Sequence, residues 1–202
     1  EFVNEKGLKA FEWILENIEF DVVFRCTTTI YLNIDNLINF LDDKKMINFY
    51  SGVTHTFPHY EVPEEDKLLF LSGAGCFFSR DVVQKLIDNK NQYDFSLNDD
   101  VAIGKLLVRN LGVPIQDARY QDFLYGYPAF NNIDFTHYHY RFKLGNTSLK
   151  LHYPRFLEVL ILLSLHIKIK YIKNEKKSTK FLYLLMDYFL PSVFELLRYL
   201  NP

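Results

Sequence analysis

Two adjacent carboxylates, Asp99 and Asp100, are the side chains of this sequence best suited to proton transfer. They stand at the head of an amphipathic segment, and a loop over residues 89–96 leads the chain to them. One role for such a pair is structural, because carboxylates complement the positive end of a helix dipole and accept hydrogen bonds from its first backbone N–H groups. The other is catalytic, because a positioned carboxylate acts as a general base. The pair alone does not decide between these roles.

A run of small residues and a run of basic residues flank the acidic pair in the sequence. Gly73, Ala74 and Gly75 follow Ser72 and let the backbone approach another group closely. Residues 136–143 alternate in character, and an extended chain there would place four basic side chains on one face: His137, His139, Arg141 and Lys143. Such a row suits a diphosphate. A solvated strand face is the alternative interpretation.

Three threonines follow the first apolar run that resembles a strand. Residues 21–26 are short, apolar and β-branched, which predicts a buried strand. In α/β sheets, ligands bind just beyond the carboxyl ends of the strands. Thr27, Thr28 and Thr29 therefore occupy positions where a ligand is expected.

The elements that must position these groups follow from hydrophobic periodicity. Helices are predicted over 7–18, 34–41 and 80–89, the last with Ser79 as its N-cap. A fourth helix should begin at Asp99 or Asp100, run to about residue 110 and close through a left-handed Gly112. Extended segments are predicted over 21–26, 48–53, 68–71, 76–78 and 113–115, and loops over 54–67 and 117–135.

Length and composition indicate one main globular domain. The 202 residues can bury one sizeable core, and 49 % hydrophobic with 24 % charged residues is ordinary for a globular protein. A net charge of −2 gives no basic excess, so we expect no nucleic-acid partner. Cys26 and Cys76 each lie in an apolar run and are expected to be buried free thiols of a reducing, cytoplasmic compartment, with a disulfide between them as the alternative.

The pattern changes near residue 149, so we predict a main domain over 1–148 and a C-terminal amphipathic helical region over 149–202. Two apolar runs there, 156–172 and 181–200, are interrupted by charged residues and fall short of the roughly 18 uninterrupted apolar residues of a membrane span. They are predicted to lie on a membrane surface or to pack on the domain. The basic run 173–180 would attract anionic lipid and favours peripheral membrane contact.

Three motifs in this order resemble the second half of a GT-A glycosyltransferase, and specifically the fringe-like β-1,3-glycosyltransferases with their small bacterial and viral relatives. The motifs are residues 24–33 (Phe-Arg-Cys-Thr-Thr-Thr-Ile-Tyr-Leu-Asn), 72–75 with 79–81, and 98–104 (Asn-Asp-Asp-Val-Ala-Ile-Gly). The resemblance covers residues 5–145 and implies an α/β fold, with a mixed sheet flanked by helices. Nothing before residue 5 matches the family's first βαβ unit, which grips the uridine, so we expect a fragment that lacks this unit.

The resemblance implies an inverting glycosyltransferase that moves a sugar from a nucleotide-sugar donor, a UDP-sugar, to a glycan or glycoconjugate acceptor, as in polysaccharide biosynthesis. By match to the family's acidic pair, Asp100 is the general base and Asp99 its neighbour. The donor-binding positions that we carry over or infer are Arg25, Thr27, Thr28, Thr29, Gly73, Ala74, Gly75, His137, His139, Arg141 and Lys143.

The family's first motif normally holds a divalent metal, Mn²⁺ or Mg²⁺, through an Asp-rich sequence. The matching positions here are Thr27, Thr28 and Thr29, whose neutral side chains do not supply the charge that a hard dication needs. We therefore expect metal-independent transfer in which the basic row offsets the charge of the leaving group. Because the family often uses a late His as a ligand, His137 or His139 remains a candidate for metal binding. The alternative function is a non-catalytic sugar- or protein-binding domain that kept the fold after losing the metal motif.

Overall fold

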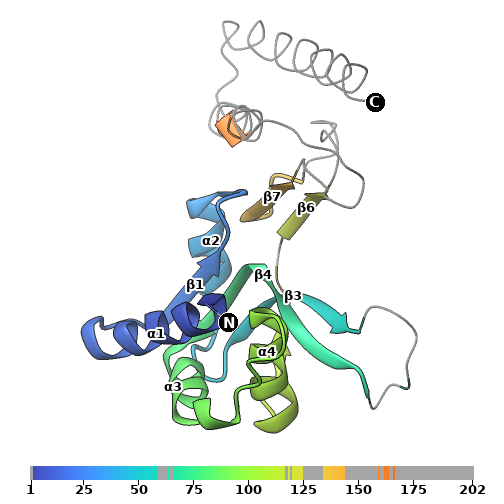
Figure 1. The fold of residues 1–202 in the computed structure, drawn as a ribbon. Helices are drawn as coiled ribbons and strands as arrows, with labels where there is room; N and C mark the ends of the chain where they lie inside the picture. Colours follow the sequence, from blue (N-terminus) through green and yellow to red (C-terminus); the bar gives the residue numbers. More distant parts are fainter. Residues whose placement is uncertain are drawn as a thin grey trace, which may run out of the picture. The chain divides into compact units, whose positions relative to one another are not determined.

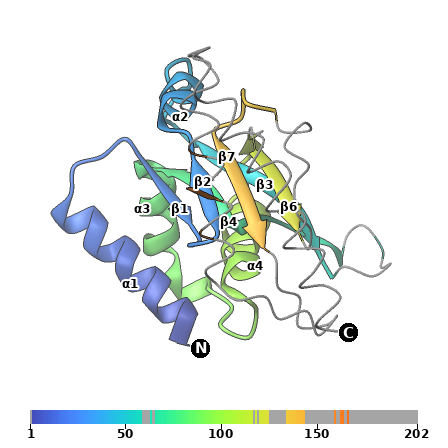
Figure 2. The same cartoon turned by 90° about the horizontal axis from the view of Figure 1, so that it is seen from above.

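A computed structural model describes residues 2–58, 63, 66–116, 118, 120–124, 134–143, 159, 162, 163 and 166 (Figures 1 and 2). The chain divides into two compact units. The first contains residues Glu1–Thr27 and Asp43–Ala118, and the second contains Thr28–Asp42 and Arg119–Pro202.

Among its described residues, the first unit is built on a mixed four-stranded sheet with the order β1-β4-β3-β5. Its strands are β1 (Val22–Cys26), β3 (Tyr50–Phe57), β4 (Leu68–Ser79) and β5 (Ile115–Gln116). Both β1 and β3 pair with β4 in the antiparallel sense, whereas β5 pairs with β3 in the parallel sense. A mixed sheet with flanking helices is the coarse architecture that the sequence predicts.

The longest strand, β4, contains an irregular stretch that positions the site. The sequence predicts two short strands separated by residues 72–75, but β4 runs unbroken through this stretch, so that prediction is wrong. The β3–β4 register nevertheless shifts here, because Gly52 pairs with Cys76 while Thr54 pairs with Leu71. Residues 72–75 of β4 therefore lie opposite the single β3 residue between these pairs, as in a β-bulge.

Three helices pack against this sheet through one apolar core. They are α1 (Phe2–Asn17), α3 (Arg80–Asp88) and α4 (Asp99–Gly104), and the 3-10 turn η2 (Lys90–Gln92) follows α3 (Figure 1). The core combines Leu8 and Phe11 of α1 with Val82 and Leu86 of α3, among others. The first helix begins at residue 2, five residues before the predicted start. Leu15 of this helix also packs against the core, whereas Ile18 lies beyond the helix and is exposed.

The helix that carries the acidic pair continues beyond α4 as a π-helical segment, η3 (Lys105–Asn110). The predicted end near residue 110 is confirmed, although the change to π-helical hydrogen bonding was not expected. Gly112 has a φ of +65°, which confirms the predicted left-handed closure. The amide of Leu111 donates to Leu106 O at 3.1 Å, and Val113 N donates to Leu107 O at 2.9 Å.

The second unit contains a three-stranded sheet with the order β2-β7-β6. Its strands are β2 (Ile30–Leu32), β6 (Tyr120–Leu124) and β7 (His139–Lys143). The helix α2 (Ile34–Leu41) has the predicted bounds, and its N-cap Asn33 accepts a hydrogen bond from Asn36 N at 3.3 Å. A loop was predicted over 117–135, but β6 lies inside that range and pairs in parallel with β7.

Other boundaries and burial predictions also need correction. Strand β3 extends to Phe57, where a loop was expected from residue 54. The run 21–26 becomes an edge strand with mostly half-buried side chains, because β4 is its only partner among the strands that the structure describes. Cys26 is exposed, so its predicted burial is wrong, whereas Cys76 is buried and both thiols are free.

The predicted C-terminal helices, 156–172 and 181–200, fall outside the described residues except at four helical positions. These positions are Val159, Leu162, Leu163 and His166. The proposed boundary at residue 149 stays a prediction. Among the helices that the structure describes, none has the length and apolar character needed to cross a bilayer.

Two glycines give opposite predictions for stability. A Cβ built on Gly104 would lie 2.3 Å from Phe70 Cβ and 2.7 Å from Leu69 O, because α4 rests directly on β4. We expect Gly104→Ala to lower the free energy of unfolding by about 1–3 kcal/mol, as overpacking does. Gly7→Ala is the matched control, because no atom lies within 4 Å of its added Cβ, and it should stabilise α1 by about 0.5–1 kcal/mol. Urea denaturation measures both, and a neutral Gly104→Ala would contradict the close packing of α4.

Candidate active site

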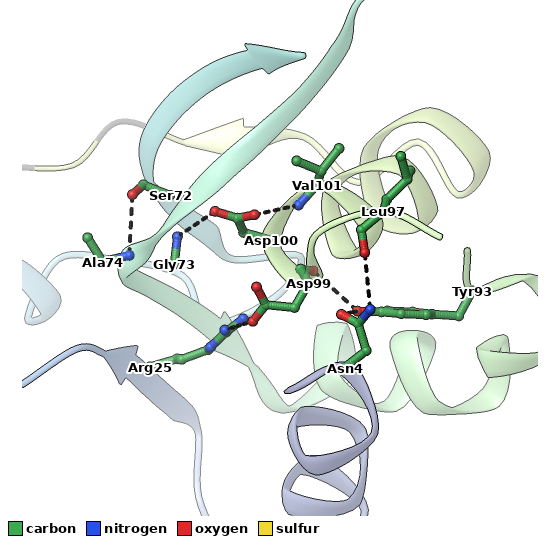
Figure 3. Close-up of polar contacts among 10 residues, drawn as sticks. All are labelled: Asn4, Arg25, Ser72, Gly73, Ala74, Tyr93, Leu97, Asp99, Asp100 and Val101. Atoms are coloured by element: carbon green, nitrogen blue, oxygen red, sulfur yellow. Dashed lines mark hydrogen bonds and ion pairs between the residues drawn. The ribbon is translucent and has the colours of Figure 1, made fainter. Parts of the chain in front are cut away.

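The two predicted acids open α4, and their side chains point to different strands (Figure 3). Asn98 takes the N-cap position with an extended ψ of 149°, and Ala102 N donates to Asn98 O at 2.8 Å to begin the helix. Figure 3 shows the Asp99 carboxylate directed at Arg25 of β1 and the Asp100 carboxylate directed at Gly73 of β4. Both carboxylates are partly buried.

Asp99 forms an ion pair with Arg25, in which the guanidinium Nη2 donates to Asp99 Oδ2. Both side chains are partly screened from solvent, with relative exposures of 25 % for Arg25 and 21 % for Asp99. Burial acts to lower the pKa of Arg25, but the neighbouring negative groups, with Asp99 the largest and Asp100 also contributing, outweigh it and the pKa is raised. A permanent cation therefore stands beside the acidic pair.

Asp100 is held by two backbone N–H groups. Its Oδ1 accepts from Val101 N at 2.9 Å, and its Oδ2 accepts from Gly73 N at 3.3 Å. A Cβ added to Gly73 would lie 3.7 Å from Asp100 Oδ2 and 3.6 Å from Arg25 Nη2, which is ordinary van der Waals contact. Gly73 therefore borders both the carboxylate and the guanidinium, and a side chain there would contact them.

Tyr93 and Asn4, which were not predicted from the sequence, hold the backbone at and before the acidic pair. Tyr93 directs its hydroxyl to Asn4 Oδ1 at 3.0 Å and to the Asp99 carbonyl oxygen at 3.2 Å. Asn4 Nδ2 donates to Leu97 O at 3.1 Å, so α1 holds the loop that precedes α4. Tyr93 and Asn4 are both buried, and burial together with the Asp99 charge raises the pKa of Tyr93. Neither residue belongs to a sequence motif, and no local signal could have identified them.

The remaining predicted positions divide between the two units. Arg25, Thr27, Gly73, Ala74 and Gly75 belong to the first unit with the acids, and Thr27 N donates to Ala74 O at 3.3 Å. The structure thus brings Arg25 to Asp99 and Gly73 to Asp100. Thr28, Thr29 and the four basic residues belong to the second unit.

The predicted row of four charges is wrong at His139. This residue is buried, and burial, followed by the charge of Arg141, lowers its pKa to about 4. His139 is therefore neutral at pH 7 and adds no positive charge to a diphosphate site. His137 precedes β7, and its Nδ1 lies 3.2 Å from Asp134 Oδ2. Arg141 is half-buried on β7, and its donor-binding role, like that of Lys143, stays a prediction.

The described side chains do not fit an Asp-rich metal site. Within the described part of the chain, no group of three or more His, Cys, Asp or Glu residues is arranged to hold a metal ion. Asp99 already binds the Arg25 guanidinium, and a dication placed at this carboxylate would be repelled by that charge. Thr27, Thr28 and Thr29 carry neutral side chains. We therefore assign no reaction step to a metal.

Comparison with known proteins identifies one family. A family model described as Galactosyltransferase matches residues 2–119, which is more than half of the chain. The matched range runs from α1 to β5 and contains Arg25, Gly73, Asp99 and Asp100, whereas the basic residues of β7 lie outside it. No curated protein matches the chain.

The lowered pKa of His139 predicts how stability depends on pH. The unfolded chain, with an ordinary histidine pKa of 6.5, binds more protons than the folded chain between pH 6.5 and about 4. The stabilising contribution of neutral His139 is present above pH 6.5 and is lost as the pH falls toward 4, by up to roughly 3 kcal/mol.

The measurement is urea denaturation at several pH values between 4 and 7.5 for wild type and His139→Gln. We expect the variant to lose stability less steeply below pH 6.5 than wild type. His55→Gln is the matched control, because His55 is exposed on β3, and it should keep the wild-type slope. Equal slopes for wild type and His139→Gln would show that His139 is not held neutral by burial.

Proposed function

This chain belongs to the galactosyltransferase family, and from that membership we propose an inverting glycosyl transfer in which Asp100 is the general base. Membership makes the chain a hexosyltransferase and implies a nucleotide-sugar donor. The GT-A architecture, fringe-like β-1,3 transfer, a UDP-sugar donor and a glycan or glycoconjugate acceptor belong to the proposal. They are supported by the order of three motifs, of which 98–104 carries the acids.

The proposed reaction is a single displacement at the anomeric carbon of the donor sugar. The acceptor hydroxyl oxygen attacks the anomeric carbon of the donor sugar, and the bond from that carbon to the diphosphate oxygen breaks. The hydroxyl proton passes to the carboxylate of Asp100, and the nucleoside diphosphate leaves with the bonding electron pair. A positioned base of this kind typically contributes about 10²–10⁴ to the rate.

The contrast between the two carboxylates is the observation that supports Asp100. Asp99 forms an ion pair with Arg25, and taking a proton would cost it that pair. Asp100 is oriented by backbone N–H groups of Gly73 and Val101, which hold a carboxylate without bringing a full charge to it. A carboxylate that is positioned in this way can accept a proton and keep its place.

A second part of the proposal concerns the leaving diphosphate. Positive charge must meet the negative charge that develops as the glycosidic bond breaks. Because the described residues do not fit an Asp-rich metal site, we assign this task to side chains, and Arg141 is the strongest candidate of the predicted row. Its planar fork can bind two phosphate oxygens at once.

A non-catalytic sugar- or protein-binding domain is the alternative proposal. The neutral residues Thr27, Thr28 and Thr29 favour it, since they stand where the family normally carries acids. The alternative predicts nucleotide-sugar binding without release of nucleoside diphosphate by the full chain.

We predict that Asp100→Asn abolishes transfer. The amide keeps the shape of the carboxylate but cannot take the acceptor's proton, so kcat should fall by about 10²–10⁴ with an unchanged melting temperature. Release of nucleoside diphosphate from a panel of nucleotide sugars measures it. Asp88→Asn, at an exposed position on α3, is the matched control and should leave turnover unchanged. A mild Asp100→Asn with a severe Asp99→Asn would move the base by one residue.

We also predict that transfer persists in excess EDTA and depends on Arg141. Wild type should keep full turnover after metal removal, whereas Arg141→Ala should lose about tenfold or more, because a charge-assisted pair with phosphate is worth roughly 1.5–3 kcal/mol. Arg109→Ala, at an exposed position of η3, is the control for loss of one arginine. Complete inhibition by EDTA that Mn²⁺ reverses would overturn the metal-independent part of the proposal.

A further inference from the structure

Arg25 is the side chain through which strand β1 contacts the head of α4. It lies next to the end of β1, and its guanidinium pairs with Asp99, the first residue of the helix. The same Nη2 atom lies 3.6 Å from the position of a Cβ on Gly73, so Arg25 also borders the bulged part of β4. One guanidinium is thus paired with Asp99 and lies beside the strand whose Gly73 N–H binds Asp100.

We propose that Arg25 is a positioning residue, which fixes Asp99 and thereby aims the neighbouring carboxylate of Asp100 at its place of reaction. This inference rests on the proposed function of Asp100 as the base. Arg25 thereby acts through the acids, whereas it was predicted from the sequence to bind the donor.

Asp99 is held at two points that lie on opposite ends of the residue. Arg25 holds the carboxylate, and Tyr93 holds the backbone carbonyl with a hydrogen bond of 3.2 Å. Asn4 contacts the Tyr93 hydroxyl at 3.0 Å and fixes Leu97 O at 3.1 Å, two residues before Asp99. Because both the side chain and the main chain of Asp99 are held, the first turn of α4 has little freedom to rotate.

The orientation passes from Asp99 to Asp100 through the peptide bond that they share. Because this bond is planar and both residues belong to the first turn of α4, a fixed Asp99 limits the directions in which the Asp100 side chain leaves the backbone. The Asp100 carboxylate then meets Gly73 N at 3.3 Å and Val101 N at 2.9 Å. If Arg25 is removed, Asp99 is left as a partly buried carboxylate without its cation, and the first turn is expected to shift toward solvent.

The chemistry of this role favours arginine over lysine. A guanidinium is planar and always charged, so it fixes direction as well as charge, whereas an ammonium on a flexible stem supplies charge alone. An ion pair made by a half-buried arginine also keeps Asp99 from taking the acceptor's proton in competition with Asp100. The two carboxylates are thereby given different tasks.

The kinetic test compares Arg25→Gln, Asp99→Asn, the double variant and Arg25→Lys with wild type. Misplacing a reacting group by about 1 Å can cost 10²-fold, so we expect each single variant to lower kcat by about 10–100-fold with the donor KM within about twofold of wild type. The double variant should lose no more than the worse single variant, since both remove one interaction. Arg25→Lys should fall between Arg25→Gln and wild type. Arg109→Gln, at an exposed position of η3, is the matched control and should be unaffected.

A second measurement needs no activity. Hydrogen exchange of the Gly73 amide, followed by NMR, reports the hydrogen bond to Asp100. Asp100→Ala sets the value for its loss, and we expect Arg25→Gln and Asp99→Asn to accelerate exchange by about tenfold, with no change in Arg109→Gln.

The outcomes separate the inference from the function on which it rests. A raised donor KM with unchanged kcat in Arg25→Gln would make Arg25 a donor contact and would overturn the inference. Unchanged Gly73 exchange in Arg25→Gln would overturn it as well, whether or not the chain turns over a donor. Full turnover by Asp100→Asn would instead refute Asp100 as the base, while the exchange rates still decide whether Arg25 positions this carboxylate.

Discussion

The ion pair between Arg25 and Asp99 joins the two parts of the first unit that the site requires, namely strand β1 and the head of α4. Helix α4 is only six residues long before it becomes π-helical, so its own hydrogen bonds fix its direction weakly. Packing on β4 through Gly104 fixes one end of α4. The ion pair, together with the hydrogen bonds of Tyr93 to Asn4 and to the Asp99 carbonyl, fixes the other end. The position of Asp100 depends on both attachments.

The bulge in β4 explains why small residues stand at 72–75. A strand that pairs on both sides uses its amides in the ladder, and the register shift opposite β3 releases Gly73 N to donate to Asp100. The backbones of β3 and β4 also approach closely at Gly52 and Gly75, because a Cβ on Gly52 would lie 2.9 Å from Gly75 O. The small residues thus allow β3 and β4 to pack closely and allow Gly73 N to reach the Asp100 carboxylate.

Sequence patterns predicted the parts of this structure that depend on local periodicity and failed where burial depends on distant segments. Hydrophobic spacing located helix 34–41, the helix C-cap pattern located the left-handed Gly112, and the predicted start of a helix at the two acids agrees with the first residue of α4. Alternation assigned His139 to a face but could not say that this face is covered, so its neutral state was missed. Cys26 was misjudged for the same reason, since an apolar run does not reveal that its strand lies at an edge. Asn4 and Tyr93 act only through contacts between distant segments.

The charge balance at the acids connects these observations with the chemistry of the leaving group. One guanidinium against two carboxylates leaves a single net negative charge at the head of α4, too little to attract a hard dication that prefers several anionic oxygens. The same charges are compatible with a general base, because Asp100 remains to take a proton while Asp99 stays paired with Arg25. Thr27, which directly follows β1 in the same unit, is neutral and adds no further acid to this balance. We therefore interpret the ion pair as the feature that separates the two acids, because it keeps Asp99 paired with Arg25 and leaves Asp100 for the proton of the proposed transfer.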